Sequence, residues 1–163
     1  AAEAFFGRQL DHDVISEAFA QLTLPARFEI VQRHPTVIID GAHNPPAASV
    51  VAETLFEDFA TEERPVLVIG ANRPRDPQQL LEALNGTEFS KIIVTAANWS
   101  RAVPANELAA ALGGNGGAIE VVPQVSDAVD RAIEIAGETG LVLITGSLYV
   151  ASEARSQLVD TSR

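Results

Sequence analysis

The chain has 163 residues, of which 47% are hydrophobic and 20% charged, the size and composition of one ordinary globular domain with a proper core. Its formal net charge of −11 is opposite to the basic footprint that general nucleic-acid binding or a polybasic membrane contact requires. The absence of cysteine excludes a disulfide framework and thiolate chemistry. No signal peptide and no apolar run near the ~20 residues that span a bilayer is visible. We therefore expect a cytoplasmic domain that contacts neither nucleic acid nor membrane.

The first predicted element is a helix over residues 11–22, where apolar side chains recur at helical spacing. Two strands follow over 28–32 and 36–39, joined by a three-residue turn, so we expect an antiparallel hairpin. The second of these strands is a run of β-branched residues, which is typical of a strand covered on both faces. A helix over 45–59 comes next, with apolar residues on one face.

The rest of the chain alternates between strands and helices. We predict strands over 65–69, 91–95, 119–122 and 141–145, and helices over 77–84, 104–112, 126–136 and 148–159. The alternation predicts a mostly parallel sheet. The expected fold class is therefore α/β: a Rossmann-like sheet of about six strands with helices on both faces and the first hairpin strand as an antiparallel edge. Residues 1–23 are expected to be a lead-in helical segment to an α/β domain over 24–163.

Polar residues gather in the loops that follow the predicted parallel strands. Carboxyl ends of parallel strands meet at one edge of the sheet, where open α/β folds bind their ligands. The residues concerned are Asp40, His43 and Asn44; Asn72, Arg73, Arg75 and Asp76; Asn98, Trp99, Ser100 and Arg101; and Thr145, Ser147 and Tyr149. In an acidic domain, the arginines among them indicate an anion-binding face or a docking face for another domain. The alternative is that these polar residues are solvated loop residues that bind no ligand.

The loop after strand 36–39 reads Asp40-Gly41-Ala42-His43-Asn44-Pro45-Pro46. Asn44 is a favoured helix N-cap, and Pro45 fits the first helical position. An acid, an imidazole and a helix N-terminus thus converge, which suits a ribose hydroxyl, a phosphate or a carboxylate. The alternative is that neither residue binds a ligand. Asp40 would then be a hydrogen-bonding residue at the end of a strand, and His43 a loop histidine whose hydrogen bonds are made within the protein.

Three motifs resemble the C-terminal domain of the folylpolyglutamate synthase/dihydrofolate synthase family, a branch of the Mur ligase superfamily. The first is Asp-Gly-Ala-His-Asn-Pro over 40–45. The second is Leu-Pro-Ala-Arg-Phe-Glu over 24–29, which is similar to the family's Pro-Gly-Arg-Phe-Glu segment. The third is Thr-Gly-Ser-Leu-Tyr over 145–149. They occur in the family's order and approximate spacing, and the resemblance spans roughly residues 5–158.

The resemblance implies an ATP-dependent carboxylate–amine ligase with ATP and Mg²⁺ as cofactors. Such an enzyme activates a folate or dihydropteroate carboxylate as an acyl phosphate, which the amino group of glutamate attacks. It implies an ATP-binding group, with Arg27 at the phosphates, Asp40 at the ribose, and His43 and Asn44 beside the nucleotide. More weakly, it implies a glutamate-side or phosphate-side group made of Arg75, Asp76, Arg101 and Ser147.

Nothing in the sequence resembles a Gly-x-x-x-x-Gly-Lys-Ser/Thr phosphate loop, and Lys91 is the only lysine. The chain also has no Met. We therefore expect a piece of a longer protein, whose N-terminal P-loop ATPase domain supplies the Mg²⁺ ligands and closes against this one. The chain by itself is expected to be inactive and to hold no catalytic residue. The three histidines lie in different elements, so we expect no metal site within it.

The loop over 70–77 departs from the family, because it reads Gly-Ala-Asn-Arg-Pro-Arg-Asp-Pro where an Asp-Lys-Asp element is usual. This leaves two other functions open: a non-catalytic nucleotide-binding or interaction domain of the same fold, and another Mur-type amino-acid ligase. The motif at 145–149 favours the folate branch over the peptidoglycan branch. In the full-length protein, we expect Arg27→Ala and Asp40→Asn to impair ligation and leave the fold nearly unchanged.

Overall fold

A six-stranded sheet forms the centre of the computed structural model, which describes residues 5, 7, 9, 11–20, 24–59, 63–113 and 118–160. The spatial strand order is β1-β2-β6-β3-β4-β5. β1 pairs antiparallel with β2, and all the other neighbours pair in parallel. The predicted fold class is therefore confirmed, including the antiparallel edge. The strands are β1 (Glu29–Arg33), β2 (Thr36–Ile39), β3 (Val66–Ile69), β4 (Lys91–Val94), β5 (Ala118–Val121) and β6 (Leu141–Thr145).

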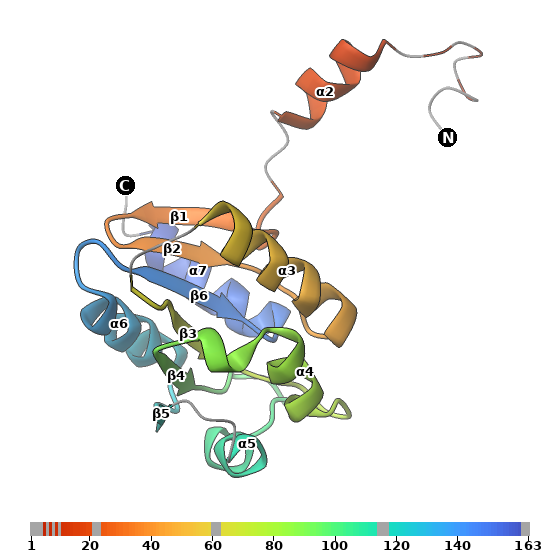
Figure 1. The fold of residues 1–163 in the computed structure, drawn as a ribbon. Coiled ribbons are helices and arrows are strands. Elements are labelled where there is room, and N and C mark those ends of the chain that lie inside the picture. Colours follow the sequence, from red (N-terminus) through yellow and green to blue (C-terminus); the bar gives the residue numbers. More distant parts are fainter. Residues whose placement is uncertain are drawn as a thin grey trace.

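Helices cover both faces of the sheet (Figure 1). One face packs against α3, α4 and α5, and the other against α6 and α7. The helices are α2 (His12–Ala20), α3 (Pro45–Asp58), α4 (Pro77–Ala83), α5 (Ala105–Leu112), α6 (Val125–Ala136) and α7 (Leu148–Asp160), with a short 3₁₀ helix, η1 (Gly86–Glu88).

Each central strand supplies side chains to two separate hydrophobic cores. In β2, Ile38 belongs to the core under α3, α4 and α5, whereas Val37 and Ile39 belong to the core under α6 and α7. In β6, Leu143 and Val142 divide between the two cores in the same way. This is the alternation of period two that a strand imposes. It explains why these strands read as continuous apolar runs in the sequence.

The predicted lead-in helix is present as α2, which begins at His12 and projects away from the sheet (Figure 1). Val14, one of the apolar residues that predicted it, is 59% exposed. Much of the segment over 1–23 lies outside the described residues, so the lead-in boundary stays a prediction.

Several element boundaries differ from the sequence prediction by one residue, and the start of β1 has an identifiable cause. β1 begins at Glu29 because Phe28 has a φ of +44°, which no strand residue adopts. α6 begins at Val125, one residue early, with Gln124 in the cap position and no side-chain cap hydrogen bond.

An ion-pair cluster joins β4, β5 and α6. The Glu120 carboxylate lies 2.9 Å from Arg131 Nε and 3.0 Å from Lys91 Nζ. Hydrogen bonds from Arg131 and Lys91 hold the pKa of the Glu120 carboxyl below its ordinary value of 4.5. A carboxyl whose pKa is depressed by folding stabilises the fold above its unfolded-state pKa, and the contribution is lost as pH falls through the folded-state value.

We therefore expect Glu120→Gln to destabilise the domain at pH 7 and to have a smaller effect at pH 3. Urea unfolding at both pH values measures the difference. Glu134→Gln is the matched control, because Glu134 is more exposed and forms its ion pair with Arg131 on the same helix. A Glu120→Gln effect that is equal at both pH values would contradict the assignment of this cluster as a pH-dependent stabiliser.

Candidate functional site

Asp40 is a buried carboxylate that holds two backbone segments together. It is 7% exposed and lies directly after β2. Its Oδ1 accepts a hydrogen bond from Ala42 N–H at 2.6 Å, and its Oδ2 accepts one from Phe28 N–H at 2.8 Å. Two of the three family-like motifs are thus joined through one side chain.

The turn that carries Arg27 has an unusual backbone. Ala26 and Phe28, on either side of Arg27, have φ values of +53° and +44°, in the left-handed region that favours glycine. The Pro-Gly-Arg-Phe-Glu segment of the family that this chain resembles has glycine at the position of Ala26. The turn is closed by hydrogen bonds from Arg27 N–H to the Leu24 carbonyl at 3.2 Å and from Gly41 N–H to the Ala26 carbonyl at 2.9 Å.

The Arg27 side chain lies over the segment after β2. Its Nη1 donates to the Ala26 carbonyl at 3.0 Å. A methyl group on Gly41 would come within 2.8 Å of that nitrogen and would also overlap the Leu148 side chain. Gly41 is therefore the position that lets Arg27 and Leu148 approach the backbone of this loop.

The structure brings together the four residues predicted to bind nucleotide. Arg27, Asp40, His43 and Asn44 line one pocket of about 410 Å³ at the carboxyl edge of the sheet. The rest of its wall is mostly apolar and comes from the β2–α3 segment: Gly41, Ala42, Ala47, Val50 and Val51. The last three have i, i+3, i+4 spacing and so form one stripe on α3. Val50 is 61% exposed, an apolar side chain left open to this pocket.

His43 presents one defined hydrogen-bonding nitrogen. Its Nδ1 lies 2.9 Å from the Gly41 carbonyl oxygen. A carbonyl oxygen only accepts, so Nδ1 must carry the proton, and Nε2 of the neutral ring is then an acceptor. A ligand hydroxyl or amino group is the complementary partner.

The first turn of α3 uses its backbone N–H groups internally, so binding of an anion at this helix end stays a prediction. Asn44 caps the helix as predicted, with its Oδ1 accepting from Ala47 N–H at 3.0 Å. Pro45 and Pro46 have no N–H, and Ala48 N–H already bonds to the Asn44 carbonyl. The two prolines and the cap thus use up the backbone donors of the first turn. Among the residues that line the pocket, Arg27 is the arginine, with a guanidinium suited to an anion.

The second predicted group does not join the first. Arg75, Asp76, Arg101 and Ser147 are not among the residues that line the Arg27 pocket. Asp76 caps α4, because its Oδ1 accepts from Gln78 N–H at 2.9 Å. Ser147 is fully buried. Arg75 and Arg101 are exposed side chains at the same sheet edge.

Asn72 joins three loops, a role that sequence reasoning missed. Its Nδ2 donates to Ser147 Oγ at 2.8 Å, and Ser147 Oγ also accepts from Tyr149 N–H at 3.2 Å. Asn72 also forms an isolated antiparallel bridge with Ala102, in the loop after β4. The only sequence signal was its place in a polar loop after a buried strand, which does not reveal its partners.

The divergent loop over 70–77 is attached to the loop after β4. Arg73 N–H bonds to the Arg101 carbonyl, and Arg73 Nη2 lies 2.6 Å from a carboxylate oxygen of Glu107 on α5. Trp99, in the same neighbouring loop, stacks on Tyr149 with ring centroids 4.2 Å apart. These contacts assign Arg73 and Trp99 to holding the loops together.

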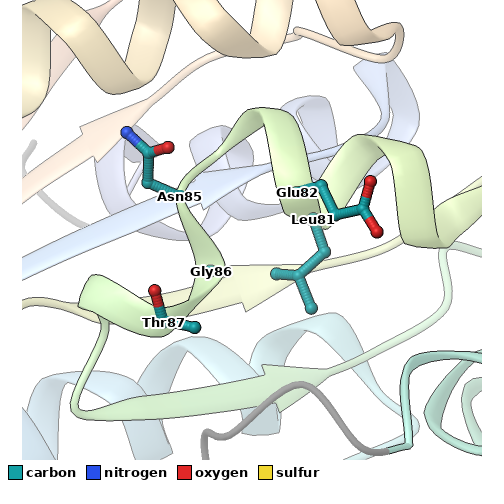
Figure 2. Close-up of a pocket in the computed structure, with 5 residues that line it drawn as sticks. All are labelled: Leu81, Glu82, Asn85, Gly86 and Thr87. Atoms are coloured by element: carbon teal, nitrogen blue, oxygen red, sulfur yellow. The ribbon is translucent and has the colours of Figure 1, made fainter.

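A second hollow lies away from this chemistry. It is lined by five residues at the junction of α4 and η1: Leu81, Glu82, Asn85, Gly86 and Thr87 (Figure 2). This junction precedes β4, so it lies at the amino edge of the parallel strands. It contains no basic residue and none of the predicted site residues. The carboxyl-edge pocket is therefore the candidate functional site.

Comparison with known proteins identifies the family to which this fold belongs. The family model described as "Mur ligase, glutamate ligase domain" matches residues 26–148. The chain belongs to this family. The match begins in the turn that carries Arg27 and ends just after Ser147, so it contains the 40–45 motif whole and most of the other two.

Relatives of this Mur ligase domain include folate enzymes. The chain is 36% identical to dihydrofolate synthase/folylpolyglutamate synthase of Mycobacterium tuberculosis, across 96% of this chain and 36% of that protein. It is similar, with a TM-score of 0.83 and 35% identity, to the M. tuberculosis folylpolyglutamate synthase solved with ADP and AMPPCP, covering 96% of this chain and 37% of that one.

A more distant relative acts in another branch of the family. UDP-N-acetylmuramoyl-L-alanyl-D-glutamate–2,6-diaminopimelate ligase of Aquifex aeolicus is 29% identical, across 84% of this chain and 29% of that protein. The chain thus spans about a third of the length of these relatives. No helix in the described part of the chain is both long and apolar enough to cross a membrane.

Proposed function

We propose that this Mur ligase domain forms one side of the active site of an ATP-dependent carboxylate–amine ligase that adds glutamate to folate or dihydropteroate. The observation that carries the proposal is the convergence of the Arg27 turn and the 40–44 loop on one pocket. It is supported by the folate enzymes among the relatives and by the similar M. tuberculosis structure, which was solved with ADP and AMPPCP.

The pocket has the chemistry that a nucleotide needs. The Arg27 guanidinium is a forked cation suited to phosphate oxygens. His43 Nε2 is an acceptor for a hydroxyl or amino group, and the α3 stripe that includes Val50 suits the flat face of a base. A ribose hydroxyl at Asp40 would have to share an oxygen that already accepts a backbone hydrogen bond.

The other reactants are assigned to the neighbouring loops and to a second domain. Arg75 and Arg101 are exposed cations at the same sheet edge and would attract the carboxylates of glutamate or the acyl substrate. An N-terminal ATPase domain would supply the phosphate loop and the Mg²⁺ ligands. Closure of the two domains would exclude water from the acyl phosphate.

Two alternatives remain testable with the same full-length protein. The diaminopimelate-adding relative favours a Mur-type ligase with another amino acid, and the divergent 70–77 loop favours a domain without ligase activity. Phosphate release with folate, dihydropteroate or UDP-N-acetylmuramoyl-L-alanyl-D-glutamate, each with a panel of amino acids, separates the three. Turnover only with glutamate on folate or dihydropteroate supports the proposal, turnover only with another amino acid supports the first alternative, and no turnover with any pair supports the second.

We expect Arg27→Ala in the full-length protein to lower kcat/KM for ATP by about 10- to 100-fold, the loss associated with a hydrogen bond to a charged group. Steady-state kinetics over ATP concentration measures it. Arg27 is exposed, so the thermal melt should be nearly unchanged. Arg33→Ala is the control, because Arg33 is an equally exposed arginine at the far end of β1. Equal kinetics for the two variants would remove Arg27 from the site.

A further inference from the structure

One ion pair connects α7 to the turn that carries Arg27. Arg155 Nε, on α7, donates to both carboxylate oxygens of Glu29, at 3.1 and 2.9 Å. The Glu29 side chain is only 10% exposed. Its Oε2 also accepts from Ala26 N–H at 2.8 Å. The Glu29 carboxylate therefore receives hydrogen bonds from the helix and from the turn at the same time.

The two left-handed residues of the turn are each held by a carboxylate. Ala26 N–H bonds to Glu29, and Phe28 N–H bonds to Asp40. A left-handed conformation costs a residue other than glycine about 1–2 kcal/mol, and it persists only where the surroundings enforce it. The backbone on both sides of Arg27 is therefore maintained by these two acids.

α7 contributes at a second point. Leu148, at its start, packs against Gly41 beside the Arg27 guanidinium. Burial raises the pKa of the Glu29 carboxyl, but hydrogen bonds from Arg155 and from Ala26 N–H outweigh burial and leave the pKa below its ordinary value. Glu29 is thus ionised at neutral pH, as the ion pair requires.

We propose that Glu29 and Arg155 are positioning residues that hold Arg27 over the pocket, with α7 as the rigid support. The ion pair fixes the turn in its left-handed conformation, and the turn directs the Arg27 side chain across Gly41. The consequence for nucleotide binding rests on the proposed function, whereas the control of the turn by α7 does not.

Limited trypsin digestion of the 163-residue chain tests the control of the turn, because trypsin cleaves after Arg27 only when the turn opens. Cleavage at Arg27–Phe28 is quantified by mass spectrometry relative to cleavage after Arg101. We expect Arg155→Leu to raise this ratio at least about 5-fold. Arg131→Leu is the control, since it removes the ion pairs of Arg131 with Glu120 and Glu134, away from the turn.

Glu29→Gln provides a second variant that keeps an acceptor for Ala26 N–H and removes the charge. An increased ratio with Arg155→Leu or Glu29→Gln supports the proposal that Glu29 and Arg155 hold the turn. An unchanged ratio in both, or an equal rise with Arg131→Leu, overturns it.

A double-mutant cycle in the full-length protein tests the link to nucleotide. If Arg155 acts through Arg27, Arg155→Leu should raise KM for ATP several-fold in the natural background and have no further effect in an Arg27→Ala background. Additive effects would overturn the proposed link. Arg27→Ala could itself leave ATP kinetics unchanged while Arg155→Leu raises the trypsin ratio. In that case the control of the turn by Glu29 and Arg155 stands and the proposed nucleotide site fails.

Discussion

Gly146→Ala is expected to lower the free energy of unfolding by about 4 kcal/mol, a large fraction of the total stability of an ordinary domain. Gly146 has a φ of +93°, which only glycine adopts readily. A methyl group there would overlap the carbonyl oxygen of Gly70 and come within 2.9 Å of the Ile69 side chain. The oxygen belongs to backbone and cannot move aside as a flexible side chain would.

The expected loss therefore has two parts, a conformational cost and a steric one. Gly137→Ala separates them, because Gly137 also has a positive φ, +62°, but has open space around its missing Cβ. Urea unfolding of both variants measures the difference. If Gly146→Ala is no more destabilising than Gly137→Ala, then the backbone contact between the loops after β6 and β3 does not constrain the fold.

Asp40→Ala is expected to lower the free energy of unfolding by about 3 kcal/mol. The substitution leaves Ala42 N–H and Phe28 N–H without their acceptor, and a buried donor without a partner costs about 1–3 kcal/mol. Asp40→Asn should lose about half as much, because an amide can accept only one of the two hydrogen bonds and turns an N–H group toward the other donor. The sequence-based expectation that Asp40→Asn leaves the fold nearly unchanged is therefore revised.

Asp76→Ala is the control for Asp40. Asp76 also follows a parallel strand, but it is an exposed N-cap that accepts a hydrogen bond from Gln78 N–H, so its loss should be about 1 kcal/mol or less. Chemical unfolding of the isolated chain gives both values. A loss at Asp40 that is no larger than at Asp76 would show that Asp40 does not hold the Arg27 turn.

The structural role of Asp40 changes how ligase assays on its variants must be interpreted. A variant that loses activity can have lost either the conformation of the Arg27 turn or a contact with a ribose. The trypsin ratio at Arg27–Phe28 separates the two effects. A normal ratio with impaired ATP kinetics would assign a direct ligand contact to Asp40, and a raised ratio would assign the loss to the turn.

Local pattern in the sequence was enough to predict the architecture. Continuous β-branched runs such as Val37–Ile39, alternating with helical spacing, predicted buried parallel strands, because periodicity reports which faces of an element are covered. The parallel arrangement then predicted a carboxyl edge that collects Asp40, His43 and Arg101. The Asn44 cap was predictable for the same reason, since its partner is only three residues away.

The partners of the site residues were decided by tertiary structure. β6 lies between β2 and β3, which brings Ser147 to Asn72 across 75 positions of the chain. Glu29 meets Arg155 across 126 positions. Local periodicity carries no information about strand order or about which distant side chain reaches a given acid. The family resemblance pointed to Arg27, but only the packing of α7 and the buried carboxylates determines how Arg27 is held at this edge.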